Sequence, residues 1–347
     1  MAINIQFVSE LYIERSDFMI NFKRIFAFVL ACAMLASLAA CNKGENAVTT
    51  VPVTMEGATV PPMEVPDIDR GEEKINIAAP ADATGLAFSK LIIDRSYAYN
   101  VEIKDVTSAS AAEKIKNGEV EIAVVSLADA AKLAAEADIK ILAVNSVVKL
   151  SLVENGDTLK DVSDLNGKTV YCGVTDAASQ AVAKEIFDDN GTKVELIFAS
   201  AADVEAKMKN SEATICIFAE PDATRIVSAN GGYAKKADLT AAWKKDFAPI
   251  QSCIVVRADY AVANPETIME FAEHIEMCSN SLLDEAGIGR AALQFVENGY
   301  FSSKELAEEA INSCGFVYID GEEMQALIEN NCKFLADNGV EITAPQF

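Results

Sequence analysis

Apolar positions between residues 74 and 150 fall into two alternating patterns. The runs INIAAP, VEIKDV, EIAVVS and IKILAVNSV are short and apolar, which predicts strands, and the segments between them carry apolar residues at helical spacing. Ser110 and Glu113 predict a capping box at the start of the helix SAAEKIKNG. Alternating strands and helices of this kind predict an α/β fold with helices on both faces of a parallel sheet.

The same alternation resumes after residue 155. KTVYCGV, KVELIFA, ATICIFA and SCIVVRADY predict strands, and DAASQAVAKEIFDDNG predicts a helix ending on Asn190-Gly191. From Asn264 onward the pattern is mostly helical, with the short runs GFVYID and VEIT. We therefore expect two lobes, each a mostly parallel sheet flanked by helices, with hinges near Leu150–Glu154 and Arg257–Tyr260 and a ligand cleft between the lobes.

The N-terminal segment has a different character. Lys23 and Arg24 precede an apolar stretch of about 15 residues, as in a secretory signal, and a membrane span needs roughly 20. The run ends in LAAC, which resembles the lipobox of bacterial lipoproteins and implies that Cys41 is acylated and becomes the mature N-terminus. The alternative is an ordinary signal peptide with an accidental cysteine. Met19 opens a conventional signal, so translation starts at either Met1 or Met19.

The chain is thus expected to have five parts. Residues 42–73 contain four prolines and no periodic apolar pattern, which predicts a flexible tether. The expected parts are a signal peptide (1–41), the tether (42–73), the first part of lobe 1 (74–151), lobe 2 (152–257) and the return of lobe 1 (258–347).

The charge balance excludes one class of partner. The formal net charge is −24, and residues 1–41 contribute none of it because they carry three basic and three acidic side chains. Such a surface repels phosphate backbones, and no basic stripe is present, so we expect no nucleic-acid binding.

Six cysteines follow Cys41, and an even number in an exported chain is compatible with three disulfides. Several lie inside apolar strand-like runs, which favours buried free thiols. No Cys-x-x-Cys pair occurs, and the only histidine, His274, flanks an apolar helix face, so we expect a structural histidine, no metal and no cofactor. The six cysteines are Cys172, Cys216, Cys253, Cys278, Cys314 and Cys332.

Polar residues near strand ends and helix starts are the candidates for ligand binding, because helix N-termini there present unpaired N–H groups. Some of them, such as Thr84, Ser126 and Ser179, could instead only cap helices. The candidates are Asp82, Thr84, Ser126, Asn145, Thr175, Asp176, Ser179, Glu220, Gln251 and Ser252.

This set contains acids and amides but neither arginine nor lysine, which favours a neutral or nitrogen-bearing ligand over an anion. Glu220 or Asp176 would then accept hydrogen bonds from an amino group. Helix N-termini could alternatively hold a sulfonate, and Trp243 is the expected platform for stacking against a ring.

Four segments resemble one protein family. They are GEVEIAVVSLADAAKL, LSLVENGDTLKDVSDLNGKTVYCGVTDAASQ, IFAEPDATRI and VVRADYAVANPETIMEFAEHI, within residues 74–338. In this order they are similar to type II periplasmic binding proteins of the sulfonate, taurine, nitrate and thiamine-pyrimidine group. The loop Val174–Ser179 departs from the family's Gly-Ser-rich form, which often carries a histidine.

The resemblance implies a lipid-anchored, extracytoplasmic solute-binding protein, on the outer face of the cytoplasmic membrane or in the periplasm. It would be a monomer that delivers a small nitrogen- or sulfur-containing molecule to an ABC permease and its ATPase. The alternatives are a sensing or partner-binding surface lipoprotein and a pyrimidine- or menaquinone-pathway enzyme. Enzyme activity is disfavoured because the chain has no Walker A loop and no Gly-x-Ser-x-Gly elbow.

Overall fold

The computed structural model describes residues 74–80, 82–88, 91, 99–103, 106–297 and 299–345. The predicted signal peptide, the lipobox at Cys41 and the tether lie outside the described residues. Within the described part of the chain, no helix combines the length and apolar character that a bilayer crossing requires.

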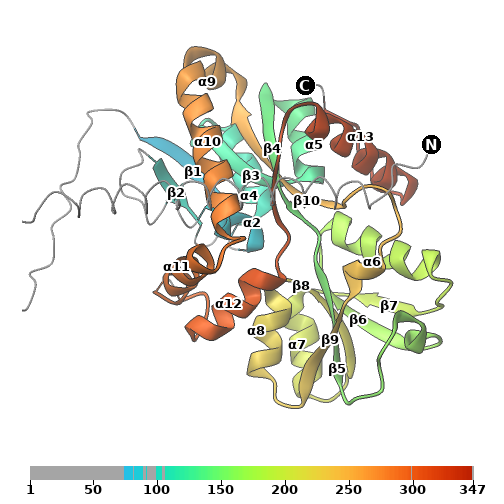
Figure 1. The fold of residues 1–347 in the computed structure, drawn as a ribbon. Coiled ribbons are helices and arrows are strands. Elements are labelled where there is room, and N and C mark those ends of the chain that lie inside the picture. The colour runs from blue at the N-terminus through green and yellow to red at the C-terminus, as the bar shows by residue number, and fades with distance from the viewer. Residues whose placement is uncertain are drawn as a thin grey trace, which may run out of the picture. The chain divides into compact units, whose positions relative to one another are not determined.

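The first sheet has six strands in the order β11-β4-β10-β3-β1-β2 (Figure 1). β1 pairs in parallel with both β2 and β3, whereas β10 runs antiparallel to β3 and β4, and β11 antiparallel to β4. The strands are β1 (Ile75–Ala78), β2 (Tyr99–Glu102), β3 (Ile122–Ser126), β4 (Ile139–Val147), β10 (Ile250–Arg257) and β11 (Phe316–Ile319).

The second sheet has five strands in the order β7-β6-β8-β5-β9. β6 pairs in parallel with β7 and β8, and β5 runs antiparallel to β8 and β9. The strands are β5 (Leu150–Asn155), β6 (Thr169–Gly173), β7 (Glu195–Phe198), β8 (Ile215–Ala219) and β9 (Tyr233–Asp238).

The predicted α/β class with two sheets is confirmed, but the sheets are mixed and not mostly parallel. β5 and β10 are the first strands after the chain passes from one sheet to the other, and each runs antiparallel to both of its neighbours. Only residues 148 and 149 separate β4 from β5. β11 follows α12 and runs antiparallel to β4.

The predicted hinge ranges lie in or beside paired strands, and whether they bend stays a prediction. Leu150–Glu154 lies inside β5, which is paired on both sides, and Arg257 ends β10 of the first sheet. β10 lies between β3 and β4, so the chain returns to the first sheet before Ile250 and not at residue 258. The sequence placed SCIVVRADY in lobe 2 because a strand's apolar pattern does not reveal which sheet it joins.

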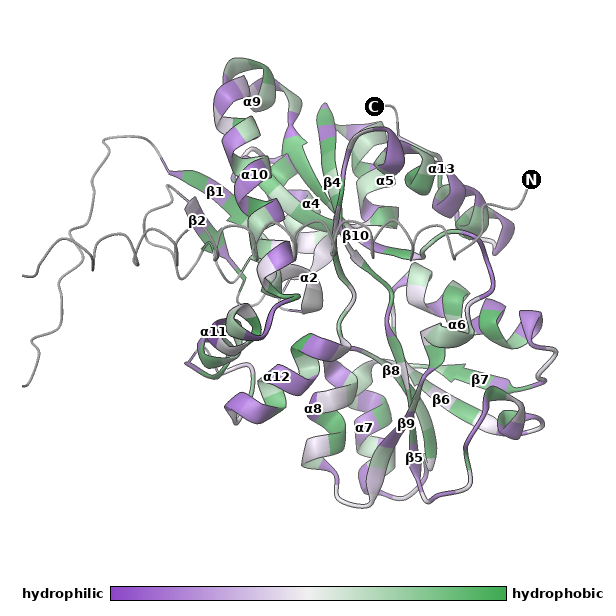
Figure 2. Cartoon of the chain, in the orientation of Figure 1, coloured by the Kyte–Doolittle hydropathy of each residue, from purple (hydrophilic) through white to green (hydrophobic). Residues whose placement is uncertain are grey.

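Helices cover both sheets, and Figure 2 shows their apolar sides facing the strands. Buried side chains from β3 and β4 form one continuous cluster with those from β6, β8 and α6, while a second cluster fills the space between the first sheet and α10 to α12. The helices are α2 (Ala83–Leu86), α4 (Ser108–Lys116), α5 (Leu127–Glu136), α6 (Ala177–Asp189), α7 (Ala201–Lys209), α8 (Asp222–Ala229), α9 (Ala258–Ala263), α10 (Pro265–Ser281), α11 (Glu285–Glu297), α12 (Lys304–Ser313) and α13 (Gly321–Asp337), with 3₁₀ turns at Val162–Leu165 and Leu239–Ala242.

Local signals were read correctly in part. The predicted box at Ser110 and Glu113 is displaced by one turn: Thr107 caps α4, and Ser110 is its third residue and completes the box. His274 lies on α10, as predicted, and its Nδ1 lies 2.9 Å from the Tyr99 hydroxyl. Cys172, Cys216, Cys253, Cys314 and Cys332 are free thiols, all buried except the partly exposed Cys314, and Cys278 is also buried.

Candidate functional site

Three aspartates follow the carboxyl ends of parallel strands in the two sheets. Asp82 follows β1, Asp176 follows β6 and precedes α6, and Asp222 follows β8 and begins α8. Burial raises the pKa of Asp82 above its ordinary value, hydrogen bonds from Thr84 oppose this, and the charges of Asp176 and Asp222 raise it further. All three carboxylates thus lie after strand ends, which is the position where ligands bind in open α/β sheets.

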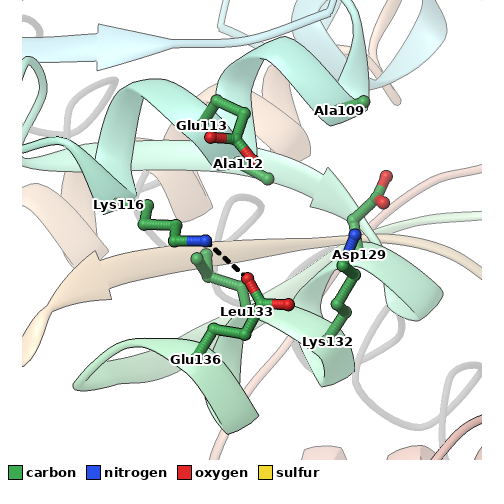
Figure 3. A pocket seen from close by; sticks show the side chains of 8 residues that line it. All are labelled: Ala109, Ala112, Glu113, Lys116, Asp129, Lys132, Leu133 and Glu136. Carbon is green, nitrogen blue, oxygen red and sulfur yellow. Dashed lines mark hydrogen bonds and ion pairs between the residues drawn. The ribbon is translucent and has the colours of Figure 1, made fainter.

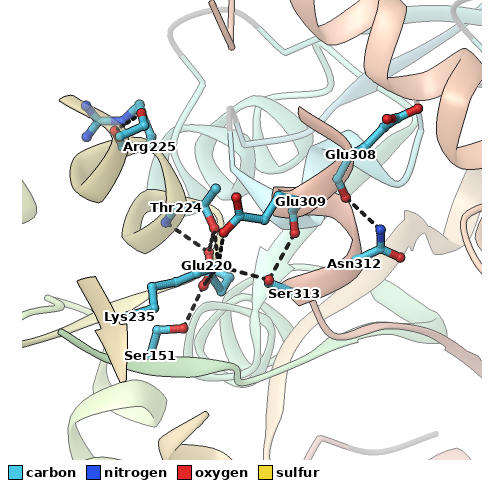
Figure 4. A network of polar contacts seen from close by, with 10 residues as sticks. Ser151, Glu220, Thr224, Arg225, Lys235, Glu308, Glu309, Asn312 and Ser313 are labelled. Carbon is cyan, nitrogen blue, oxygen red and sulfur yellow. Dashed lines mark hydrogen bonds and ion pairs between the residues drawn. The ribbon is translucent and has the colours of Figure 1, made fainter. Parts of the chain in front are cut away.

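A second polar group surrounds Glu220, the last residue before α8's Pro221 cap (Figure 4). Its side chain is 1% exposed. Oε1 accepts from the Ser151 hydroxyl at 2.6 Å, and Oε2 accepts from the Thr224 hydroxyl at 2.8 Å and from the Thr224 N–H at 3.2 Å. Lys235 Nζ lies 3.3 Å from Oε1, so the buried carboxylate is compensated by a cation.

Lys235 also connects this group to α12. Its Nζ donates to the Ser313 hydroxyl at 3.1 Å and lies 3.0 Å from Glu309 Oε1. Figure 4 shows these two residues on α12, opposite Glu220. Cys314, the next residue, lies within the fields of Glu220, Asp82 and Lys235; its pKa is raised well above the ordinary value, chiefly by burial. This thiol therefore stays protonated at neutral pH.

Two predicted residues of the first sheet, Asn145 and Ser252, form a buried network. They are 0% and 1% exposed. Asn145 donates to the Thr84 carbonyl at 3.0 Å and accepts from the Ser252 hydroxyl at 2.6 Å, and that hydroxyl also lies 2.6 Å from the Ser146 hydroxyl. These hydrogen bonds stabilise the sheet, and Thr84, which donates to Asp82, connects them to that aspartate.

The remaining candidates are scattered. Ser126 caps α5 by accepting from the Asp129 N–H, and Thr175 is exposed. Gln251 is partly buried at a bulge of β10. Ser179 is fully buried at the first turn of α6, where its N–H donates to Asp176, and its hydroxyl has no hydrogen-bond partner.

Two expectations about side-chain chemistry need correction. The site is not free of cations, because Lys235 reaches Glu220 from β9, a strand that the sequence did not predict. Trp243 is not available for stacking, because its ring packs edge-on against Phe247 and Phe334 and its Nε1–H donates to the Phe247 carbonyl at 2.7 Å. The role of Trp243 is therefore apolar packing, at the point where the chain returns to the first sheet.

The cavities among the described residues include one beside Lys235 and one between α4 and α5. One of about 360 Å³ borders the Lys235 group and is lined by Lys149, Leu150, Ser151, Lys235, Lys236, Ala237, Asp238, Asn312 and Ser313. The other is a surface groove of about 80 Å³ between α4 and α5, where Figure 3 shows Lys116 paired with Glu136. Within the described ranges, no group of three or more His, Cys, Asp or Glu side chains could hold a metal ion.

No family model and no curated protein matches this chain in sequence. Solved structures do match. An ABC transporter protein from Parabacteroides distasonis has a TM-score of 0.63 at 16% identity, covering 79% of this chain and 97% of that one. The periplasmic aliphatic sulphonate binding protein SsuA from Escherichia coli has a TM-score of 0.60 at 15% identity, covering 79% and 96%.

The alkanesulfonate-binding protein SsuA from Xanthomonas axonopodis pv. citri, bound to MOPS, has a TM-score of 0.59 at 11% identity and covers 79% of this chain and 96% of its own. The resemblance read from the sequence is therefore confirmed at the level of the fold: the chain has the two-sheet architecture of ABC transporter substrate-binding proteins.

Proposed function

We propose that this protein is an extracytoplasmic solute-binding protein, anchored by a lipid at Cys41, that captures a small organic molecule and delivers it to an ABC permease and its ATPase. The observation that carries the proposal is the two-sheet architecture shared with the matching structures, in which Asp82, Asp176 and Asp222 follow parallel strands of both sheets. A ligand held there contacts both sheets and stabilises their closed arrangement through its differential affinity.

The charges around the site favour a ligand that bears an amine. The charges of Asp176 and Asp222 both act on Asp82, Asp222 is paired with Arg225 at 3.3 Å, and Lys235, the cation beside Glu220, is already paired with Glu220 and Glu309. A protonated or hydrogen-bond-donating nitrogen relieves the repulsion among carboxylates, whereas a sulfonate increases it. An aminopyrimidine or a small amine therefore fits the site better than the alkylsulfonates named for the matching structures.

Solute binding also agrees better with the site than enzyme chemistry does. The Glu220 carboxylate is fully engaged by Ser151, Thr224 and Lys235, and burial keeps the Cys314 thiol protonated. The Glu220 carboxylate therefore lacks the open position that a general base needs, and a protonated thiol is a poor nucleophile.

Native mass spectrometry of the protein, purified without denaturation and measured before and after unfolding and refolding, tests the proposal. We expect a small adduct that is lost on refolding, and a thermal shift when aminopyrimidines or amines are added back. A sulfonate adduct would overturn the amine preference but keep the transport role. Absence of an adduct and of any shift with sulfonates, pyrimidines, amines and amino acids would overturn the transport role in favour of a sensing or partner-binding lipoprotein.

A further inference from the structure

The contact between Lys235 and α12 joins two parts of the molecule that belong to different cores. α12 packs into the first-sheet core through Ala307, Ala310 and Ile311. Lys235 lies on β9, the edge strand of the second sheet. The Lys235–Glu309 ion pair and the Lys235–Ser313 hydrogen bond therefore cross from one sheet to the other.

We propose that Lys235, Glu309 and Ser313 form an inter-sheet latch that holds the two sheets together without ligand and opens when they separate. α12 also packs against α8, and Figure 1 shows the two helices side by side at this junction. Separation of the sheets moves α12 away from α8 and β9, so these two contacts to Lys235 must break.

The burial of the partners determines which contact breaks. The side chain of Glu220 is 1% exposed, that of Lys235 is 22% exposed, and that of Glu309 is 56% exposed. Glu309 regains full hydration readily, whereas Glu220 without its cation would be an uncompensated buried charge. Lys235 therefore stays with Glu220 and Thr224 on the second sheet, and Glu309 and Ser313 leave with α12.

The latch makes ligand-free closure a property of the chain itself. The latch shifts the population towards the closed arrangement before any ligand arrives. Its consequence for ligand capture rests on the proposed function: a ligand needs less differential affinity for the closed arrangement to complete the shift. Because one partner is an exposed carboxylate, the bias weakens as ionic strength rises.

Cys314 provides the readout, because it directly follows Ser313 at the end of α12 and is partly exposed. We would treat the full, ligand-free chain with N-ethylmaleimide and quantify the Cys314 peptide by mass spectrometry. Removing the pair in Glu309→Gln should speed alkylation about two- to fivefold, the factor expected for a partly exposed ion pair. Adding Ser313→Ala should speed it further.

Glu308→Gln is the matched control. It removes the same charge one residue earlier on α12, where Glu308 pairs within the helix with Lys304 at 2.9 Å. We expect its alkylation rate to equal that of the parent chain, and added salt to accelerate the parent but not Glu309→Gln. Equal rates in Glu309→Gln and the parent, or an equal acceleration in Glu308→Gln, would overturn the latch. No ligand is added, so failure of the proposed transport role leaves this result unaffected.

Discussion

The polar groups at the strand ends of the two sheets contrast sharply. In the first sheet, Asn145 and Ser252 are uncharged, buried and hydrogen-bonded to one another. In the second, Glu220 is charged, and its cation Lys235 extends to an exposed carboxylate on another helix. Both groups arise from polar residues at strand ends, yet one fixes a sheet internally and the other connects two sheets. The contrast teaches that a polar residue at a strand end can connect two parts of the molecule when it is charged and its counter-ion also contacts a partly exposed side chain.

The largest effect should come from removing the charged member of the second group. Glu220→Ala leaves the Ser151 and Thr224 hydroxyls and Lys235 without their shared acceptor, and breaking a buried ion pair in this way costs about 3 kcal/mol. Urea denaturation measures the loss. Asp157→Ala is the control, because that carboxylate is 90% exposed beside Lys236 and should change stability by less than about 0.5 kcal/mol. Similar losses in both variants would contradict the contrast.

The uncharged group should show a smaller loss. Asn145→Ala removes the hydrogen bonds to the Thr84 carbonyl and the Ser252 hydroxyl and leaves both groups buried, at a cost of about 2 kcal/mol. Because this network is buried, the affinity for the adduct found by native mass spectrometry should not change once the variant is folded. A large loss of affinity with little loss of stability would place Asn145 in the binding site after all.

The pH dependence of stability distinguishes the Asp82 carboxylate from ordinary surface acids. The pKa of Asp82 is raised by burial and by Asp176 and Asp222, so the folded state holds its proton more tightly than the unfolded state. Stability therefore falls as pH rises from the ordinary aspartate pKa, about 4, to the folded pKa. Asp82→Asn should be more stable than the parent at neutral pH, with the gain disappearing in acid.

Asp164→Asn is the opposite case. Backbone N–H groups of Lys160 and Asp161 donate to Asp164 and lower its pKa. Its stabilising effect is present above the ordinary aspartate pKa and is lost as pH falls through the lowered value, so the asparagine variant should be less stable at neutral pH. Urea titrations between pH 3 and about pH 8 measure how the stability of each variant differs from that of the parent. A change of the same sign in both variants at neutral pH would contradict the opposite pKa shifts of Asp82 and Asp164.

Much of the fold was predictable because it depends on local pattern. The apolar runs of β1, β3, β6 and β8 and the amphipathic helices between them gave the α/β class, and residues after those strands included Asp82, Asp176 and Glu220. β9 was missed because its sequence, YAKKAD, is short and polar. Lys235 was missed together with this strand. Its partners Glu220 and Glu309 are 15 and 74 residues away along the chain, and no local pattern encodes such a pairing.

The same limit explains the buried first-sheet network. Asn145 and Ser252 were nominated because they lie near strand ends. In the sheet register, however, Ser252 lies opposite both Ser126 and Ser146. Ser146 and Ser252 hydrogen-bond to one another, whereas Ser126 bonds with Asp129, and only the strand order reveals that the three serines are neighbours. Polar residues at strand ends therefore nominate candidates, and the sheet order decides which of them remain open.

The smallest effect concerns the one predicted residue whose side chain has neither a protein partner nor exposure. The Ser179 hydroxyl is buried without a hydrogen bond, so Ser179→Ala should leave stability unchanged or raise it by up to about 1 kcal/mol. Ser279 on α10 is the matched control, since its hydroxyl is also buried and unpartnered, away from the three aspartates. Both alanine variants should keep or gain stability in urea titrations. If the first turn of α6 contacts the ligand, only Ser179→Ala should weaken binding of the adduct. Equal affinities in the two variants would show that Ser179 is a core residue without a role in binding.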